Sequence, residues 1–237
     1  MTQADPQYLS FNSKISPGLA TYQQPSEAEL EELKNRDPPL RTTWTIWEQI
    51  MQQSDAKNSA YSDATHKVAN FSTVKGFWKY WNHLPQPSEL LDGKKFVRDS
   101  GVDSRSIVDA LMLFREGIKP EWEDSTNATG GHFQFQLKPQ LGGGVIDQLW
   151  NNIVLGMIGG TIQPAEMVTG VRLVDKLTQN KMAAIRIEVW FANFEDTEKV
   201  DALQKSLEQC MGTKLDGSVE TQKSWGKTDR KTHIVKK

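Results

Sequence analysis

The adjacent pair Trp122 and Glu123 has the chemistry to recognise a flat ligand that donates hydrogen bonds. A tryptophan gains little stability on a polar loop, but its ring can stack on a nucleobase for roughly 1–3 kcal/mol per base. A carboxylate only accepts hydrogen bonds, so it suits the adjacent N1–H and amine donors of guanine. Methylation at N7 makes guanine cationic, which adds a cation–π contribution to stacking. A solvated Glu123 beside a Trp122 packed on its own loop is the alternative.

Two neighbouring segments offer cations for the same site. The segment AIRIEVWF alternates aliphatic side chains with Arg186 and Trp190, so a strand here would place these two residues on the face opposite the core. In GVRLVDK, Arg172 and Lys176 share one face of a second strand. Cations on two adjacent strands would form a small anion-binding patch, and a solvated basic face is the alternative.

Composition narrows the class of protein. The 237 residues suit one domain with a tail, and a net charge of −2 argues against a general polyanion binder, although Lys and Arg outnumber acids in 214–237. The single cysteine, Cys210, excludes a disulfide framework and argues against a cysteine-based metal site. No apolar run reaches the roughly 20 residues that span a membrane, and no signal peptide is evident. We therefore expect a cytoplasmic protein without membrane association.

The order of elements predicts an α+β fold. Residues 1–36 are polar and predict a flexible N-terminal tail, with one short helix at 26–34 where Ser26 and Glu29 form a capping-box pattern. The folded domain is expected over 37–237, with 86–106 as a long loop. Strands are expected near 42–50, 61–68, 108–115, 132–138, 167–176, 182–192, 214–220 and 231–235, and helices over 72–83, 145–158 and 196–211. This pattern favours a largely antiparallel sheet with helices on one face and a binding surface on the other.

The run FREGIKPEWEDSTNATGG (114–131) resembles the signature loop of the translation initiation factor 4E family, the messenger RNA cap-binding proteins. Further markers follow in the family's order. They are P-L-x-x-x-W-T-x-W (39–47), S-T-V-x-x-F-W-x-x-W-N-H (72–83), an L-W helix that ends in I-G (149–159), and I-x-V-W (187–190). The resemblance covers about 38–235, nearly the whole predicted domain.

The resemblance implies a fold and a function. The fold is a single curved, mainly antiparallel sheet of about eight strands, with three helices on its convex face. The function is binding of the 7-methylguanosine 5′ cap between two aromatic rings, which recruits messenger RNA for translation initiation. No catalysis, cofactor or metal is implied. A cap-hydrolysing enzyme would need a carboxylate cluster or a paired-histidine nucleophile, and neither pattern is present. A binder of another flat ligand is a further alternative.

The resemblance also assigns cap-binding residues. The cap base would contact Tyr61, Trp122, Glu123 and Trp190. The first ring is usually Trp in the family, so Tyr61 departs from the pattern and offers a smaller ring with a weaker cation–π face. The cap phosphates would contact Lys176 and Arg186, with Arg172 as the alternative to Lys176, and His132 where the family has an Arg. Nucleotides after the cap would contact Lys223, Trp225, Lys227 and Arg230.

A partner surface is implied on the opposite, dorsal face. In the family this face binds a helix with a Tyr-x-x-x-x-Leu-apolar motif, carried by a scaffold initiation factor or by another 4E-interacting protein such as a repressor. The matching positions are Pro39, Val74, Trp78, Asn151 and Leu155. The family usually has an apolar residue at position 151 and an acid at 152, where this chain has two asparagines. A cap-binding repressor that does not engage the usual scaffold is therefore the alternative function.

Overall fold

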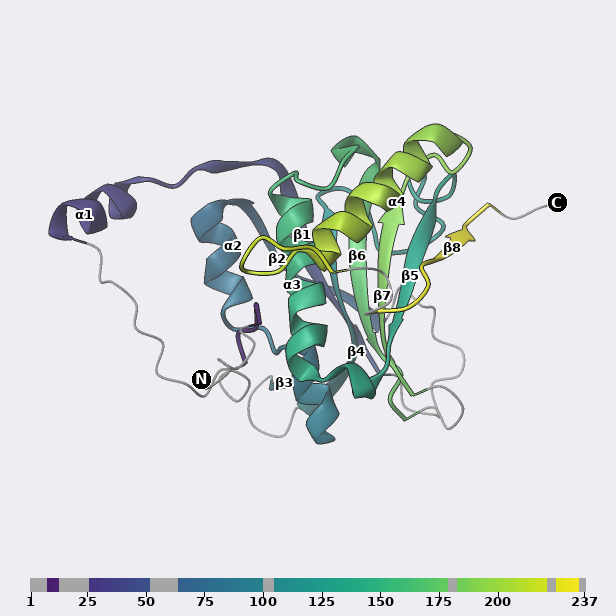
Figure 1. The fold of residues 1–237 in the computed structure, drawn as a ribbon, viewed down its shortest axis with the longest axis horizontal. Coiled ribbons are helices and arrows are strands. Elements are labelled where there is room, and N and C mark those ends of the chain that lie inside the picture. The colour runs from purple at the N-terminus through teal and green to yellow at the C-terminus, as the bar shows by residue number, and fades with distance from the viewer. Residues whose placement is uncertain are drawn as a thin grey trace.

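The computed structural model describes residues 8–12, 26–51, 64–99, 105–178, 183–220 and 225–234. They form one antiparallel sheet of eight strands in the order β2-β1-β4-β6-β7-β5-β8, with β3 paired to β4 (Figure 1). The strands are β1 Pro39–Ile50, β2 Thr65–Thr73, β3 Phe96–Asp99, β4 Arg105–Arg115, β5 Gly131–Leu137, β6 Val168–Asp175, β7 Ile185–Phe191 and β8 Asp229–Thr232. The predicted fold class is confirmed.

Three α-helices cover one face of this sheet: α2 Val74–Trp81, α3 Gly143–Ile158 and α4 Thr197–Gly212 (Figure 1). The main core lies between them and the sheet, and it contains Trp44, Trp81 and Trp150 as fully buried rings. The described residues also contain the short 3-10 helices η2 Pro87–Asp92, η3 Pro139–Leu141 and η4 Ala165–Met167.

Alternation along β7 divides its side chains between the two faces, as predicted. Ile185, Ile187 and Val189 lie in the main core with no exposed surface. Trp190 points to the other face, where it joins a second apolar cluster with Met112 of β4 and further residues. The members of this second cluster are Ala110, Met112, Phe114, Val174 and Trp190. Side chains for a binding site therefore share the face that the helices leave uncovered.

Two of the predicted elements differ from the structure. Residues 86–106, expected as a loop, contain η2 and the edge strand β3, whose four residues pair only with β4. The strand expected over 214–220 is absent from the described residues, and one isolated bridge joins Thr213 to Val219. The four residues of β3 and the segment 214–220 are both too short for hydrophobic periodicity to distinguish a strand from a turn. The second strand, expected over 61–68, is described as Thr65–Thr73, and residues 61–63 lie outside the described residues.

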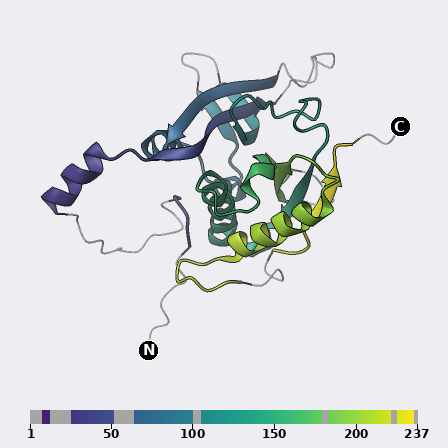
Figure 2. The same ribbon diagram turned by 90° about the horizontal axis from the view of Figure 1, so that it is seen from above.

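The predicted N-terminal helix is confirmed as α1 Glu27–Asn35, and the Ser26–Glu29 capping box is formed. Figures 1 and 2 show α1 standing apart from the sheet and its three covering helices. Residues 8–12, in contrast, lie against α3 through hydrogen bonds described below. Within the described part of the chain, no helix has the length and apolarity to cross a membrane.

Candidate functional site

The loop between β4 and β5 holds Trp122 through a network of short-range hydrogen bonds. Asp124 accepts from the backbone N–H groups of Lys119 (3.0 Å) and Thr126 (2.9 Å). The amide of Asn127, fully buried, donates to the carbonyls of Lys119 (2.8 Å) and Glu121 (3.0 Å). These bonds satisfy the backbone of a segment that has no regular structure, so the loop has a defined shape.

Trp122 is supported on one side and open on the other. Its ring stacks on His233, with centroids 5.3 Å apart and planes 15° from parallel, and lies 6.5 Å from the ring of Trp190. Even so, 53% of its surface is exposed, and Glu123 beside it is also exposed. The geometry is that of a rigid aromatic plate with an adjacent carboxylate. Tyr61, the expected second ring, lies outside the described residues.

Two glycines and two histidines join this loop to the strands behind it. A Cβ on Gly130 would overlap the carbonyl oxygen of Phe191, and one on Gly131 would overlap that of Lys231, so both positions require glycine. The Nδ1 of His132 lies 2.9 Å from the Nε2 of His233, in a buried hydrogen bond. The Nδ1 of His233 lies 3.0 Å from the carbonyl oxygen of Asn127.

Burial keeps both histidines neutral. Desolvation is the main cause that lowers the pKa of His132 to about 4, and the charges of His233, Arg186 and Lys231 add to it. Desolvation also lowers the pKa of His233. The side chain of His132 stacks on Trp190, with centroids 6.0 Å apart. His132 therefore acts as an uncharged part of the aromatic cluster in this structure, and its predicted role at the cap phosphates stays a prediction.

Glu188 lies at the centre of the predicted cation patch. It forms ion pairs with Arg186 (2.9 Å) on its own strand and with Arg172 (3.5 Å), which lies directly opposite on β6. It also accepts a hydrogen bond from the indole N–H of Trp190 (3.2 Å). Only 4% of Glu188 is exposed. Burial alone would raise its pKa, but Arg172, His132, Arg186 and the Trp190 bond together hold the pKa below its ordinary value.

Arg172 and Arg186 thus lie on the face that strand alternation predicted, on either side of the Glu188 carboxylate. Arg172 also donates to Gln49 of β1 (2.5 Å), so three strands meet at its guanidinium. Lys176, just past the end of β6, is half-buried, and its backbone N–H donates to Ala184 (3.1 Å). Both Arg172 and Lys176 stay candidates for phosphate contact.

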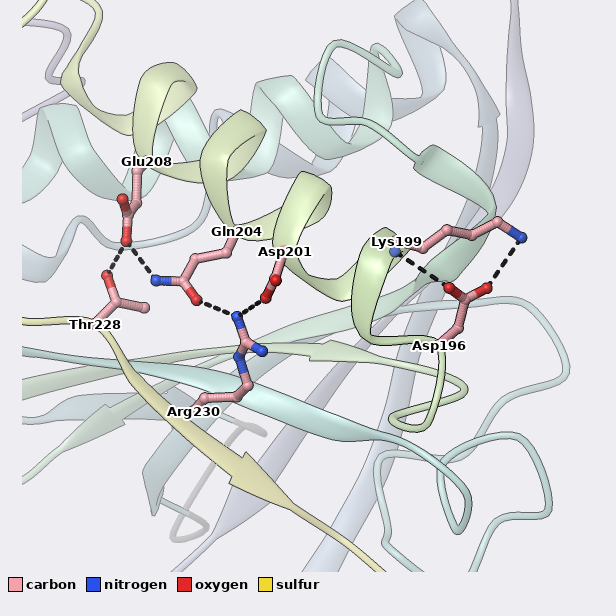
Figure 3. Close-up of polar contacts among 7 residues, drawn as sticks. All are labelled: Asp196, Lys199, Asp201, Gln204, Glu208, Thr228 and Arg230. Carbon is pink, nitrogen blue, oxygen red and sulfur yellow. Dashed lines mark hydrogen bonds and ion pairs between the residues drawn. The ribbon is translucent and has the colours of Figure 1, made fainter.

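Of the residues expected near later nucleotides, Trp225 and Lys227 border the same hollow, whereas Arg230 turns to α4. Trp225 is 5% exposed and packs in the main core, so its stacking role would require the ring to leave that core. Arg230 of β8 binds Asp201 and Gln204 of α4, both at 2.7 Å (Figure 3). Lys227 is exposed and lines a hollow of about 350 Å³ with Lys138 and Trp225. Lys223 lies outside the described residues.

The two asparagines of α3 have internal partners. The amide of Asn151, fully buried, donates to the carbonyl of Leu9 (3.0 Å) and to the side chain of Gln86 (2.8 Å). The amide of Asn152 donates to the carbonyls of Met211 (2.9 Å) and Thr213 (2.7 Å), at the C-terminal end of α4. Of the other dorsal positions, Pro39 is exposed, whereas Val74, Trp78 and Leu155 are half-buried.

Comparison with known proteins identifies the family. The model of the eukaryotic initiation factor 4E family matches residues 39–235, which is most of the chain and includes every strand of the sheet. This chain belongs to the eukaryotic initiation factor 4E family. Translation initiation factor 4E of Saccharomyces cerevisiae is 31% identical over 183 residues, covering 77% of this chain and 74% of the yeast protein.

Solved structures of family members share the fold. Ascaris suum eIF4E-3 in complex with an m2,2,7G cap superposes with a TM-score of 0.58 at 21% identity, over 74% of this chain and 85% of that one. Eukaryotic initiation factor 4E-3 of C. elegans, in complex with the 4E-binding protein Mextli and a cap analog, superposes with a TM-score of 0.57 at 21% identity. The superposition covers 77% of this chain and 90% of the C. elegans chain. At this identity the likeness establishes the fold.

Four residues of the site in this 4E-family chain were not predicted from the sequence. Glu188 follows the same period-two pattern as Arg186 and Trp190, so alternation could have placed it in the cation patch. His233 gave no local signal, because it reaches Trp122 only through the antiparallel pairing of β8 with β5. Asp124 and Asn127 were also missed, and their role is to brace the loop.

Proposed function

We propose that this chain binds the 7-methylguanosine 5′ cap of messenger RNA and recruits the message for translation initiation through a partner on its dorsal face. The exposed ring of Trp122 carries the proposal, because it is a large apolar surface held rigid by His233 and left open on its other side. A plate that is already ordered loses little conformational entropy when a base stacks on it. Tyr61 would supply the second ring.

Glu123 supplies the edge recognition in this proposal. Its exposed carboxylate neighbours the Trp122 ring and can accept the N1–H and amine hydrogen bonds of guanine. Methylation at N7 gives the base a positive charge, which strengthens both the stacking and these hydrogen bonds. The site should therefore prefer 7-methylguanine to guanine. Family membership supports this assignment, as do the cap complexes of the Ascaris suum and C. elegans proteins.

Arg186, with Lys176 or Arg172, would contact the cap phosphates. These cations border the face that carries Trp190, and the ring of Trp190 lies 6.5 Å from that of Trp122. A phosphate that binds here must compete with Glu188 for Arg172 and Arg186. Lys227 and Lys138 line a hollow that could receive the phosphates of later nucleotides.

The proposed role is binding without catalysis. Cap hydrolysis needs a divalent metal on a carboxylate cluster or a histidine nucleophile with access to the substrate. Across the described residues, no group of three His, Cys, Asp or Glu side chains is placed to hold a metal ion. The His132–His233 pair is buried, each residue being 5% exposed. The proposal therefore assigns both histidines to the support of the aromatic cluster.

Titration with 7-methyl-GTP and with GTP, followed by tryptophan fluorescence, tests the proposal. The chain should bind the methylated nucleotide at least tenfold more tightly. Trp122→Ala should abolish this binding and Trp122→Phe should retain part of it, whereas Glu123→Ala should remove the preference for the methylated base. Glu198→Ala, which truncates an exposed acid at the start of α4, is the matched control. Equal affinity for the two nucleotides would refute the proposal.

A cap-binding repressor is a second candidate, and the internal bonds of Asn151 favour it. The amide of this residue is committed to Leu9 and Gln86, so the dorsal face differs from a simple apolar groove. Binding of a peptide with the Tyr-x-x-x-x-Leu-apolar motif separates the two candidates. Capture of this peptide with micromolar or tighter affinity, together with cap binding, would exclude the repressor that ignores the scaffold.

A further inference from the structure

Residues 8–12 form a short N-terminal segment that lies across the first half of α3. Figure 1 shows it beside α2 and α3. The hydroxyl of Ser10 donates to Asp147 (2.5 Å), and the amide of Asn12 donates to the hydroxyl of Ser88 (2.8 Å). The carbonyl of Leu9 accepts from Asn151 (3.0 Å). This segment is thus joined to α3 and to η2 by side chains about 75 to 140 positions away in the sequence.

Aromatic contacts reinforce these hydrogen bonds. The ring of Phe11 meets the ring of Trp78 edge-on, with centroids 5.6 Å apart and planes at 72°. The ring of Tyr8 lies so close to α3 at Gly144 that a Cβ there would overlap it. Edge-to-face aromatic pairs are favourable beyond the area they bury. Phe11 nevertheless remains 43% exposed, so its contact with Trp78 is open to competition.

The acceptors and donors under the segment are part of the folded core. Asp147 and Asn151 have no exposed surface, and Ser88 is 5% exposed. Asp147 also accepts from the backbone N–H (2.8 Å) and the hydroxyl (2.7 Å) of Ser88. Because these groups are fixed by their own neighbours, they form a preorganised receptor for a peptide backbone and its small polar side chains.

The receptor overlaps the surface assigned to the partner helix. Trp78 of α2 and Asn151 of α3 are both dorsal positions, and the segment contacts the two of them. A helix that uses the Tyr-x-x-x-x-Leu-apolar motif would present an aromatic and two aliphatic side chains to this surface. The segment instead places the ring of Phe11 on Trp78 and the ring of Tyr8 on α3 at Gly144. Both ligands therefore bring an aromatic side chain to this surface, and both need the ring of Trp78.

We propose that residues 8–12 are an intramolecular ligand of the dorsal face, which a partner helix must displace. This inference rests on the proposed dorsal partner site. A chain whose segment is docked nine-tenths of the time binds a competing helix about tenfold more weakly than a chain without the segment. The segment thereby sets the minimum affinity that a partner needs, and selects partners that bind Trp78 more strongly than Phe11 does.

The test uses the full chain and a synthetic amphipathic peptide that carries Tyr-x-x-x-x-Leu-Leu. Calorimetry should give a peptide affinity about tenfold higher for the Ser10→Ala, Phe11→Ala double variant than for the unmodified chain. Val68→Ala, at an exposed apolar position of β2, should leave the affinity unchanged. Binding of 7-methyl-GTP should be the same in all three proteins, which shows that the fold and the cap site are intact.

Hydrogen exchange gives a second measurement on the unmodified chain. The backbone N–H of Asn12 donates to the Ser10 hydroxyl, and that of Ser10 donates to the carbonyl of Tyr8. Peptide addition should accelerate exchange at residues 8–12. Unchanged or lower peptide affinity in the double variant would overturn the inference, as would unchanged exchange or a peptide that binds none of the proteins. Loss of methyl-dependent nucleotide binding would instead count against the proposed function.

Discussion

The carboxylate of Glu188 lies between two cations that the proposed function assigns to phosphate binding. It pairs with Arg186 at 2.9 Å and with Arg172 at 3.5 Å, and 4% of its surface is exposed. Its negative charge lowers the positive potential that a phosphate group would meet. The carboxylate also orients both guanidinium groups. It therefore stabilises the site when no phosphate is bound and weakens the binding of a phosphate.

Glu188→Gln should therefore raise the affinity for 7-methyl-GTP relative to 7-methylguanosine, which lacks phosphates. Removal of one partly screened charge is worth on the order of 1 kcal/mol. This corresponds to a roughly fivefold change in the ratio of the affinity for 7-methyl-GTP to that for 7-methylguanosine. Titration of both ligands by fluorescence measures it. Glu48→Gln is the matched control, because Glu48 is a buried acid that pairs with Arg98. A ratio that falls in Glu188→Gln, or that rises equally in both variants, would show that Glu188 does not oppose the phosphates.

At the scale of elements, the amide of Asn152 in the middle of α3 meets the C-terminal end of α4. Asn152 donates to the carbonyls of Met211 and Thr213, which close the C-terminal end of α4. The last carbonyls of a helix lack intrahelical partners, so a side-chain donor that satisfies two of them stabilises the helix end. An acid at this position, as in the family pattern, has no donor to offer in its ionised form.

We expect Asn152→Glu to destabilise the fold more than Asn152→Ala does. Loss of two hydrogen bonds in Asn152→Ala should lower the free energy of unfolding by about 1–3 kcal/mol, and a carboxylate facing the same carbonyls adds repulsion. Urea unfolding at pH 7.5 measures both values. Gln209→Ala, an exposed amide in the last turn of α4, is the control and should change stability by less than about 0.5 kcal/mol. Wild-type stability in Asn152→Glu would contradict this assignment.

Hydrophobic periodicity predicted which face of a strand each side chain occupies, but it did not predict which distant segments lie next to that face. Alternation placed Arg172, Arg186 and Trp190 on one face because that information is local to each strand. The same rule is silent on which residue of β8 lies behind Trp122, since this depends on pairing between segments about 100 positions apart. It is also silent on residues 8–12, which the polar composition of 1–36 assigned to a tail although the segment hydrogen-bonds to α3.

The two faces of the one sheet serve two kinds of binding, the cap on the open face and a partner peptide on the dorsal face, where the helices lie. Ile187 of β7 packs under the helices, and its neighbour Glu188 lies on the opposite face with the cations. A ligand on the cap face and a peptide on the dorsal face therefore meet different side chains of the same strands. The sheet between them is held by a continuous core from Phe133 of β5 to Trp44 of β1.

The buried histidine pair should make the stability of the whole molecule depend on pH. The pKa of His132 in the fold is about 4, against 6.5 for an ordinary histidine, and that of His233 is also lowered. The unfolded chain therefore binds more protons between these values, and the free energy of unfolding falls as the pH drops from 6.5 towards 4. By pH 5 the loss due to His132 amounts to about 2 kcal/mol. Glu188, whose pKa is lowered, loses its contribution only below its unfolded value of 4.5.

Urea unfolding at several values between pH 7.5 and pH 5 measures this dependence above the range in which Glu188 titrates. His132→Gln keeps a hydrogen-bonding side chain but cannot take up a proton, so its unfolding free energy should fall less steeply with pH than that of the unmodified chain. His66→Gln removes an exposed histidine of β2 and should keep the original slope. Comparison of slopes removes the pH-independent cost of each substitution. An equal slope in His132→Gln and in the unmodified chain would mean that His132 is not held neutral by its burial.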